Sequence, residues 1–392
     1  MRTGARIIDL HGPASGFYDF HPDRSMNFQC NRWLGWIGPE AYPPIVSTVR
    51  GIRSYPAWID AFLALAENTR RDGDAGAAAY YDRAAEFFMI TDDPRKTPTR
   101  TRFVQTMRDA YEVEPERIPY ENGWLPTYDL HPAQTPIGPP VLLFGGFDSY
   151  VEELLPMLAA IVAAGHRVIA FEGPGQGGAL EEAHLPLTHE WERPVSAVLD
   201  HYGLNDVTAV GISLGGGLVI RAAAYEPRIK RVVAFDILDD FLEVLGRQIA
   251  PGITGPLRAL LTVRARGVVN AVANRASARR AVSRWGLWQG MHVTATHSPF
   301  DFLAAAQALN TRSVSGLVTA DVLLIAGTED HYVPLHQLHR QAAGLTAARS
   351  VTTRVFTAAE DASNHCQVGN MGACVREILA WIDTKSLTNQ TI

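Results

Sequence analysis

The pattern with the clearest chemical meaning is a serine between glycines at residues 211–215, which read Gly-Ile-Ser-Leu-Gly. It follows an apolar, β-like run that starts at Val207 and precedes a helical stretch that starts near Gly216. A nucleophile elbow needs this setting, because glycines two positions on either side of the serine permit the tight turn that exposes its hydroxyl. We therefore predict that Ser213 is a nucleophile. The alternative is a glycine-rich turn that carries an inert serine.

A serine hydroxyl reacts only when a base takes its proton and a carboxylate orients that base. Along the chain, the apolar run 322–325 leads into Glu329 and Asp330, and His365 is the one histidine after the last predicted strand. We predict Asp330 as the acid and His365 as the base, with Glu329 as the alternative acid; both carboxylates could also be solvated loop charges. Three further histidines are predicted to lie at the surface near the acid: His331, His336 and His339.

The oxyanion that forms during attack by a serine needs two amide donors. We predict that the first is the amide of Leu214. The second is predicted to be the amide of Phe147, in the loop 145–149, which reads Gly-Gly-Phe-Asp-Ser and follows an apolar run. An ordinary glycine turn at the end of a strand is the alternative for this loop.

Six short apolar runs, separated by helical stretches, must position these residues. Such runs alternating with helices predict a doubly wound, mostly parallel α/β sheet covered on both faces, as in the α/β-hydrolase fold. The runs are Val141–Phe144, Arg167–Phe171, Val207–Val210, Arg231–Phe235, Val322–Ile325 and Thr352–Phe356.

Helical spacing of apolar residues predicts two amphipathic helices between Pro56 and Met89 and another over Thr101–Tyr111. More than eighty residues separate the fourth and fifth runs, which is too long for an ordinary crossover. We predict an N-terminal, mostly helical domain (1–115), a catalytic core (116–236 and 321–392) and a helical cap insertion (237–320).

Composition narrows the classes of partner. The chain has 392 residues, a net charge of −6 and only a short arginine cluster at 279–284, so nucleic acid is not an expected partner. Three cysteines without a C-x-x-C spacing are expected to be free thiols in a reducing compartment. We find no leader pattern, and the longest apolar run, 155–164, is half of a membrane span. We predict a cytoplasmic protein without membrane contact, metal or other cofactor.

Several of these motifs together resemble one branch of the α/β-hydrolases, which carries a helical N-terminal domain. They are the segment 27–33, the loop 145–149, the element 171–177, the pentapeptide 211–215 and the tripeptide 365–367. The branch includes 2,6-dihydroxypseudooxynicotine hydrolase and the fungal pigment polyketide-shortening hydrolases and, more distantly, the fermentation/respiration switch proteins. The resemblance spans nearly the whole chain and is weakest from Leu238 to Ala320.

The resemblance implies cleavage of a carbon–carbon bond in an aromatic or polyketide-like ketone, with Ser213 adding to the ketone and His365 protonating the leaving carbon. It also implies that the chain can form a homodimer. Some members place an additional acid near the nucleophile; four acids are candidates for it here: Asp236, Asp239, Asp240 and Glu243. Candidate substrate-binding residues are Asn31, Arg32, Trp33, Trp285, Trp288 and Met291. Asn31 and Arg32 could instead tie the helical domain to the core.

Two other functions fit the same sequence. One is a carboxylesterase, a lactonase or an acyl-transferring cyclase on a bulky aromatic or polyketide substrate, because the same three residues serve all of these reactions. The other is a non-catalytic binding protein on a hydrolase scaffold.

Overall fold

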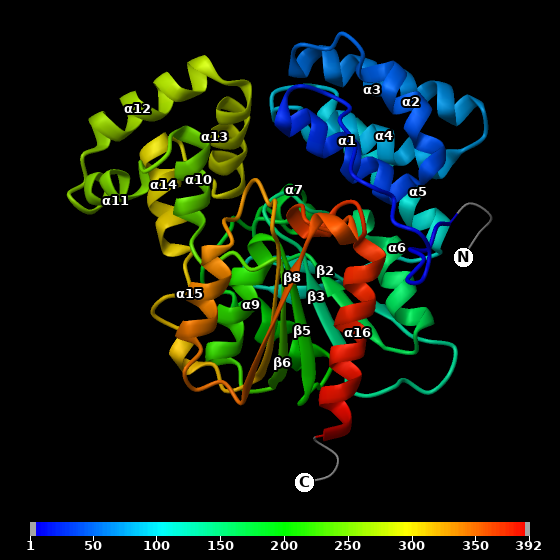
Figure 1. The fold of residues 1–392 in the computed structure, drawn as a ribbon, viewed down its shortest axis with the longest axis vertical. Coiled ribbons are helices and arrows are strands. Elements are labelled where there is room, and N and C mark those ends of the chain that lie inside the picture. The colour runs from blue at the N-terminus through cyan, green and yellow to red at the C-terminus, as the bar shows by residue number, and fades with distance from the viewer. Residues whose placement is uncertain (1–4, 389–392) are drawn as a thin grey trace.

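The computed structural model describes residues 5–388, and its centre is one eight-stranded sheet (Figure 1). The strand order is β1-β2-β4-β3-β5-β6-β7-β8; β1, β2 and β4 pair antiparallel, and the remaining neighbours pair parallel. The strands are β1 (Glu116–Tyr120), β2 (Gly123–Leu130), β3 (Val141–Phe144), β4 (Val168–Phe171), β5 (Val207–Ile212), β6 (Ile229–Phe235), β7 (Asp321–Gly327) and β8 (Ser350–Phe356).

Five α-helices precede the sheet and lie together above one of its edges (Figure 1). They are α1 (Arg24–Ile37), α2 (Tyr42–Val49), α3 (Tyr55–Arg71), α4 (Ala75–Phe87) and α5 (Lys96–Tyr111), with the short 3-10 turn η1 (Pro39–Ala41). Side-chain caps fix where several of them begin: Asp23 accepts a hydrogen bond from the Met26 amide and Ser54 accepts one from the Ala57 amide.

A second group of helices follows β6 and precedes β7 along the chain, and it lies above the other side of the sheet (Figure 1). We call residues 237–320 the cap segment. Its helices are α10 (Phe241–Ile249), α11 (Thr254–Thr262), α12 (Arg266–Arg279), α13 (Ala281–Val293) and α14 (Pro299–Ala308), followed by η2 (Ser315–Leu317).

The remaining helices cover the sheet itself. They are α6 (Val151–Ala163), α7 (Gly177–Glu181), α8 (Glu192–His201), α9 (Leu214–Tyr225), α15 (His336–Gly344) and α16 (Met371–Thr388), with η3 (Ala358–Glu360) and η4 (His365–Gln367). Buried apolar side chains form two clusters, one on each face of the sheet. One cluster unites helices α1–α5 with α6 and α16, and the other unites α8 and α9 with the cap segment. Both helical additions thus share a core with the sheet that they cover.

The doubly wound, mostly parallel sheet predicted from the apolar runs is confirmed. Boundaries differ by a few residues: the helix after Ser213 begins at Leu214 rather than near Gly216, and α5 begins at Lys96 rather than Thr101. Within residues 5–388, no helix combines the length and the apolar character needed to cross a bilayer.

Candidate active site

Ser213 occupies the sharp turn between β5 and α9. Its backbone has φ 60° and ψ −120°, a sparsely populated conformation for a residue with a side chain. The turn leaves no space beside it: a Cβ on Gly211 would lie 1.9 Å from the Gly215 carbonyl oxygen, and a Cβ on Gly215 would lie 2.5 Å from the Gly145 carbonyl oxygen. The predicted spacing of glycines around Ser213 therefore has a steric cause on both sides of the turn.

His365 links Ser213 to Asp330. Its Nε2 lies 2.9 Å from Ser213 Oγ, and its Nδ1 lies 2.7 Å from Asp330 Oδ2. The other carboxylate oxygen of Asp330 accepts hydrogen bonds from the amides of Tyr332 and Val333 at 2.7 and 2.9 Å. Burial alone would raise the Asp330 pKa, but the adjacent His365 and these hydrogen bonds hold that pKa below its usual value.

Glu329, the alternative acid, points elsewhere. Its carboxylate accepts a hydrogen bond from Ser363 Oγ at 2.7 Å, and its amide donates to the Ser363 carbonyl. The structure thus brings Asp330, and not Glu329, to His365.

A second carboxylate also reaches His365. Asp236 follows the end of β6, and its Oδ2 lies 3.1 Å from His365 Nδ1 and accepts the amide of Cys366 at 2.5 Å. Burial first, and the neighbouring Asp330 second, raise the Asp236 pKa to about 7. The other three candidate acids are engaged in ion pairs: Asp239 with Arg340, Asp240 with Arg258 and Arg312, and Glu243 with Arg340 and His336.

Two carboxylates and two aromatic rings surround His365. Burial alone would lower its pKa, but Asp330 and Asp236 raise it well above the usual value. The rings of Phe28 and Tyr332 lie 6.2 and 5.2 Å from the imidazole, centre to centre. A protonated imidazole, which forms when the base accepts a proton, is thus stabilised by the two carboxylates at a mostly buried site.

His331, predicted to lie at the surface, is only partly exposed. The centre of its imidazole ring lies 3.8 Å from the ring centre of Tyr332 and 4.8 Å from that of Phe28, and burial lowers its pKa to about 3. The turn that directs Asp330 toward His365 also directs the next side chain against α1. His336 and His339 are exposed, as predicted.

The loop after β3 packs directly against the elbow. A Cβ on Gly146 would lie 3.0 Å from the Leu214 amide nitrogen, so glycine permits this approach. Gln176 holds the loop by donating from Nε2 to the carbonyls of Gly145 (2.7 Å) and Gly146 (3.2 Å). Within residues 5–388, the amides of Leu214 and Phe147 have no protein acceptor. Sequence reasoning did not find Gln176, which lies inside the element 171–177.

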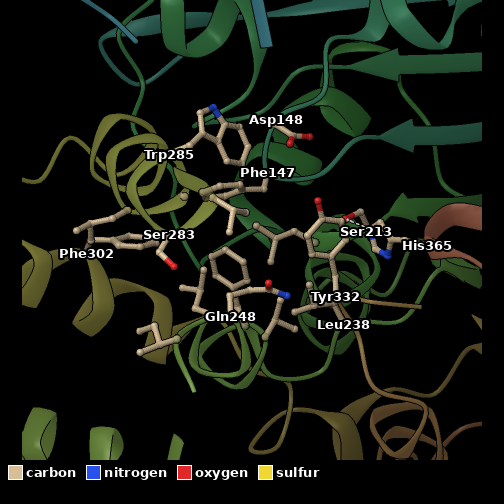
Figure 2. A pocket seen from close by; sticks show the side chains of 18 of the residues that line it. Phe147, Asp148, Ser213, Leu238, Gln248, Ser283, Trp285, Phe302, Tyr332 and His365 are labelled. Carbon is tan, nitrogen blue, oxygen red and sulfur yellow. Dashed lines mark hydrogen bonds between the residues drawn. The ribbon is translucent and has the colours of Figure 1, made fainter. Parts of the chain in front are cut away.

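A cavity of about 150 Å³ opens from Ser213 into the cap segment. Figure 2 shows Ser213 and His365 on one side of it and Ser283 and Phe302 on the opposite side. Most of the wall is apolar and comes from α10, α12, α13, α14 and the loop after β3. Its apolar side chains include Phe147, Leu238, Phe241, Leu245, Leu287 and Phe302. Its polar groups include the ion pair of Arg32 with Asp148 and the side chains of Gln248, Ser283 and Tyr332.

Two predicted substrate-binding residues line this cavity. Trp285 of α13 lines the wall and donates from Nε1 to the Phe87 carbonyl at 2.8 Å, which joins the cap segment to α4. Arg32 lines the cavity and also donates from Nε to Glu153 at 2.7 Å. The two roles considered for Arg32 are therefore compatible: it contacts the cavity and ties α1 to the core.

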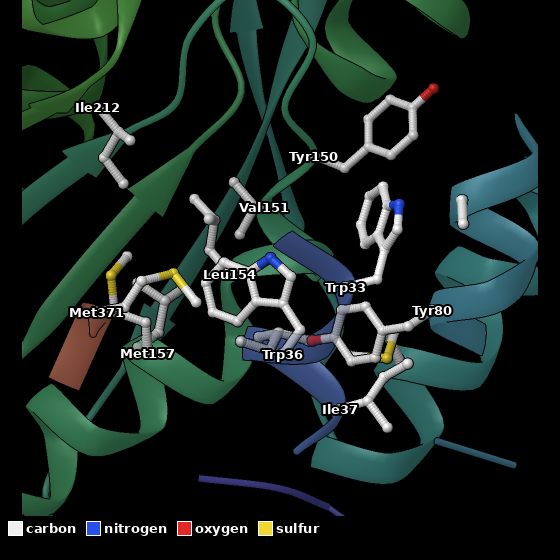
Figure 3. Close-up of a cluster of buried hydrophobic side chains, with 14 of the residues drawn as sticks. Trp33, Trp36, Ile37, Tyr80, Tyr150, Val151, Leu154, Met157, Ile212 and Met371 are labelled. Atoms are coloured by element: carbon white, nitrogen blue, oxygen red, sulfur yellow. The ribbon is translucent and has the colours of Figure 1, made fainter. Parts of the chain in front are cut away.

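The other four candidates do not line this cavity. Asn31 bonds the amide and carbonyl of Tyr18 and so orders the N-terminal segment. Trp33 is fully buried among the aromatic side chains of α1 and α4 (Figure 3). On α13, each residue advances about 100° around the axis, so Trp288 and Met291 face away from the cavity side, which is centred near Gly286.

One group of donor atoms resembles a metal site in its residue types. Ligand atoms of Asp236, His365 and Cys366 lie within 4.8 Å of one another. Both ring nitrogens of His365 already face partners, Ser213 on one side and the two carboxylates on the other. The Asp236 carboxylate in turn accepts the Cys366 amide, so His365 and Asp236 both have hydrogen-bonding partners in the chain.

Residues 139–253 match the family model described as the alpha/beta hydrolase fold. A hydrolase of Aspergillus aculeatus, acrC, is 31% identical over 325 residues, which cover 70% of this chain and 75% of that protein. The chain therefore belongs to the α/β-hydrolase family, and it is an enzyme of the hydrolase class.

Other relatives cover more of the chain. Hydrolase LUC6 of a Fusarium species is 27% identical over 93% of this chain and 97% of its own length. The 20-hydroxy-prefusarin hydrolase FUS2 of Gibberella moniliformis is 29% identical over 84% and 87%. These fungal hydrolases agree with the branch that the motifs resemble. Among solved structures, 2,6-dihydroxy-pseudo-oxynicotine hydrolase (TM-score 0.63, 19% identity, covering 89% of this chain and 93% of that one) shares the fold.

Proposed function

We propose that the protein is a serine hydrolase in which Ser213 is the nucleophile, His365 the base and Asp330 the acid that orients it. The observation that carries the proposal is the continuous contact from Asp330 through His365 to Ser213, ending at the opening of an apolar cavity. The unengaged amides of Leu214 and Phe147 are proposed as the oxyanion donors.

The proposed reaction has two halves. His365 Nε2 takes the proton of Ser213 as Oγ adds to the substrate carbonyl carbon, and the negative charge develops on the carbonyl oxygen beside the two amides. The bond to the leaving group then breaks, and the leaving atom takes the proton from His365. In the second half, water gives a proton to His365 and attacks the acyl-enzyme, which releases the acid and restores Ser213.

We propose an aromatic or polyketide-like ketone as the substrate, cleaved at a carbon–carbon bond. The apolar wall of the cavity and the fungal relatives support this, including one named as a 20-hydroxy-prefusarin hydrolase. A leaving carbon needs a proton donor, and the carboxylates around His365 favour the protonated ring that supplies it. The Ser283 hydroxyl is buried at the far end of the cavity without a partner in residues 5–388, which suits a substrate with an oxygen there.

The class of substrate that the protein turns over distinguishes carbon–carbon cleavage from the esterase, lactonase or cyclase alternative. The experiment is turnover and intact-protein mass spectrometry with aryl ketones, aryl esters and lactones of similar size. Acid and ketone-derived carbon products in equal amounts support carbon–carbon cleavage, whereas turnover confined to esters and lactones supports the alternative. A protein that a fluorophosphonate fails to label, with no turnover of any class, is the binding protein instead.

Gly286 offers a direct test of the cavity. It lies in the middle of the face of α13 that lines the cavity, and an added Cβ there would meet no heavy atom within 4 Å. We expect Gly286→Leu to fill the cavity and to lower kcat/KM for 4-nitrophenyl decanoate by about 10- to 100-fold, with less than about a threefold effect on the acetate. Steady-state kinetics with the two esters measure this ratio.

Gly267→Leu is the matched control, because Gly267 is also helical and also has open space at its Cβ, but it does not line the cavity. In the control, the ratio of kcat/KM for the decanoate to kcat/KM for the acetate should equal that of the wild type. Equal kinetics in both variants would show that acyl groups do not enter the cap segment.

A further inference from the structure

Asp236 has a position that the proposed mechanism does not use. It follows β6 directly, its side chain is 0% exposed, and its φ of 67° lies in the left-handed region, which is unfavourable for a residue with a side chain. Burial of a carboxylate also removes its hydration, which costs stability unless hydrogen bonds or a neighbouring cation offset it. Two unfavourable features at one residue indicate that its location serves the site.

The contacts of Asp236 converge on the loop that carries His365. Asp236 Oδ2 accepts the Cys366 amide, and the same oxygen lies 3.1 Å from His365 Nδ1, compared with 2.7 Å for Asp330 Oδ2. The two carboxylates follow neighbouring parallel strands, β6 and β7, so they approach the ring from the same edge of the sheet. Asp236 Oδ1 has no hydrogen-bond partner within residues 5–388.

We infer that Asp236 is a second positioning residue for His365, which shares the Nδ1 proton with Asp330 and can orient the ring when Asp330 is absent. This inference rests on the proposed role of Ser213 and His365. In this arrangement the imidazole keeps its Nε2 lone pair directed at Ser213 whichever carboxylate accepts the Nδ1 proton. An enzyme with a single orienting acid loses about 10⁴-fold in turnover when that acid becomes an amide, because the ring adopts the wrong tautomer.

The charges that face Asp236 set the expected pH effect. They are His365 and Asp330, with the thiols of Cys366 and Cys374 as further titratable neighbours. A negative charge beside the imidazole favours its protonated form, so removing Asp236 should lower the His365 pKa. The acidic limb of the pH profile should then move to lower pH.

The test is the rate at which a fluorophosphonate labels Ser213, because this rate depends on activation by His365 and needs no known substrate. We expect the labelling rate of Asp330→Asn to be less than about 100-fold below that of the wild type, and the rate of Asp236→Asn to be only a few-fold below it. The double variant should label at least about 100-fold more slowly than Asp330→Asn. Asp236→Asn should also shift the acidic limb of the labelling profile to lower pH.

Glu329→Gln is the matched control, because it removes the carboxylate next to Asp330 that bonds Ser363 instead of His365. Thermal melting identifies any variant that fails to fold, and Asp236→Ala then replaces Asp236→Asn. A double variant no slower than Asp330→Asn, with an unshifted profile, overturns the inference. A wild-type protein that is not labelled at all overturns the proposed function instead.

Discussion

Ser213→Ala is expected to abolish covalent labelling by a fluorophosphonate and to lower turnover of any accepted substrate by about 10⁴- to 10⁶-fold. The reason is that the mutation removes the atom that forms the acyl-enzyme and leaves the base without a proton to take. The hydroxyl makes one described hydrogen bond, to His365 Nε2, and the backbone turn is held by glycines rather than by this side chain. The melting temperature should therefore stay close to that of the wild type, as measured by scanning calorimetry.

Ser196→Ala is a suitable control, because Ser196 lies on α8 and its hydroxyl bonds Glu226, outside the cavity. The control should label at the wild-type rate. Full turnover by Ser213→Ala would remove this serine from the mechanism.

Glu153→Gln is expected to destabilise the protein by about 3 kcal/mol, the lower end of what breaking a buried ion pair costs. The Glu153 side chain is 1% exposed, near the start of α6, and accepts hydrogen bonds from Arg32, Arg83 and Trp36 at 2.7 to 3.2 Å. Those three side chains belong to the N-terminal helices, and Trp36 stacks on Tyr80 there (Figure 3). The change leaves buried guanidinium groups without this carboxylate. Urea denaturation of both proteins measures the loss.

Activity should fall along with stability in this variant, because Arg83 also donates to the Asp148 carbonyl in the loop that presents Phe147. The control is Glu67→Gln: Glu67 is 61% exposed and pairs with Arg70 at the surface, where an ion pair contributes well under 1 kcal/mol. Equal stability losses in the two variants would contradict the role of Glu153 as a buried anchor.

The sequence predicts the sheet well, because apolar runs and glycine spacing are local signals. Ser213 is a local signal of the same kind. Because the turn has no space for a Cβ at Gly211 or Gly215, the nucleophile can be recognised from five consecutive residues. The order along the chain then suggests Asp330 and His365, which the structure brings together. Asp236 could be proposed only as one of four acids, because its direction depends on a left-handed backbone conformation.

The residues that line the cavity could be predicted less well, because residue type does not reveal which side of a helix faces the cavity. Trp288 and Met291 are two and five residues from Gly286, about 200° and 140° around α13, so both face away from the cavity. Ser283 and Gln248 line it and carry no sequence signal, because single polar residues on helices are common. Asn31 seemed suited to bind substrate, yet its amide completes the hydrogen bonds of a neighbouring backbone.

The cap segment leaves the sheet and returns to it at nearly the same point. Asp240 and Asn310 form a β-bridge, the Phe241 amide bonds the Leu309 carbonyl, and the Thr311 amide bonds the Asp239 carbonyl. An insertion whose two ends are fastened together can be exchanged as a unit. A chimera that carries the corresponding segment of a relative, joined at these two points, should therefore keep the reacting atoms in place while acquiring a different substrate range.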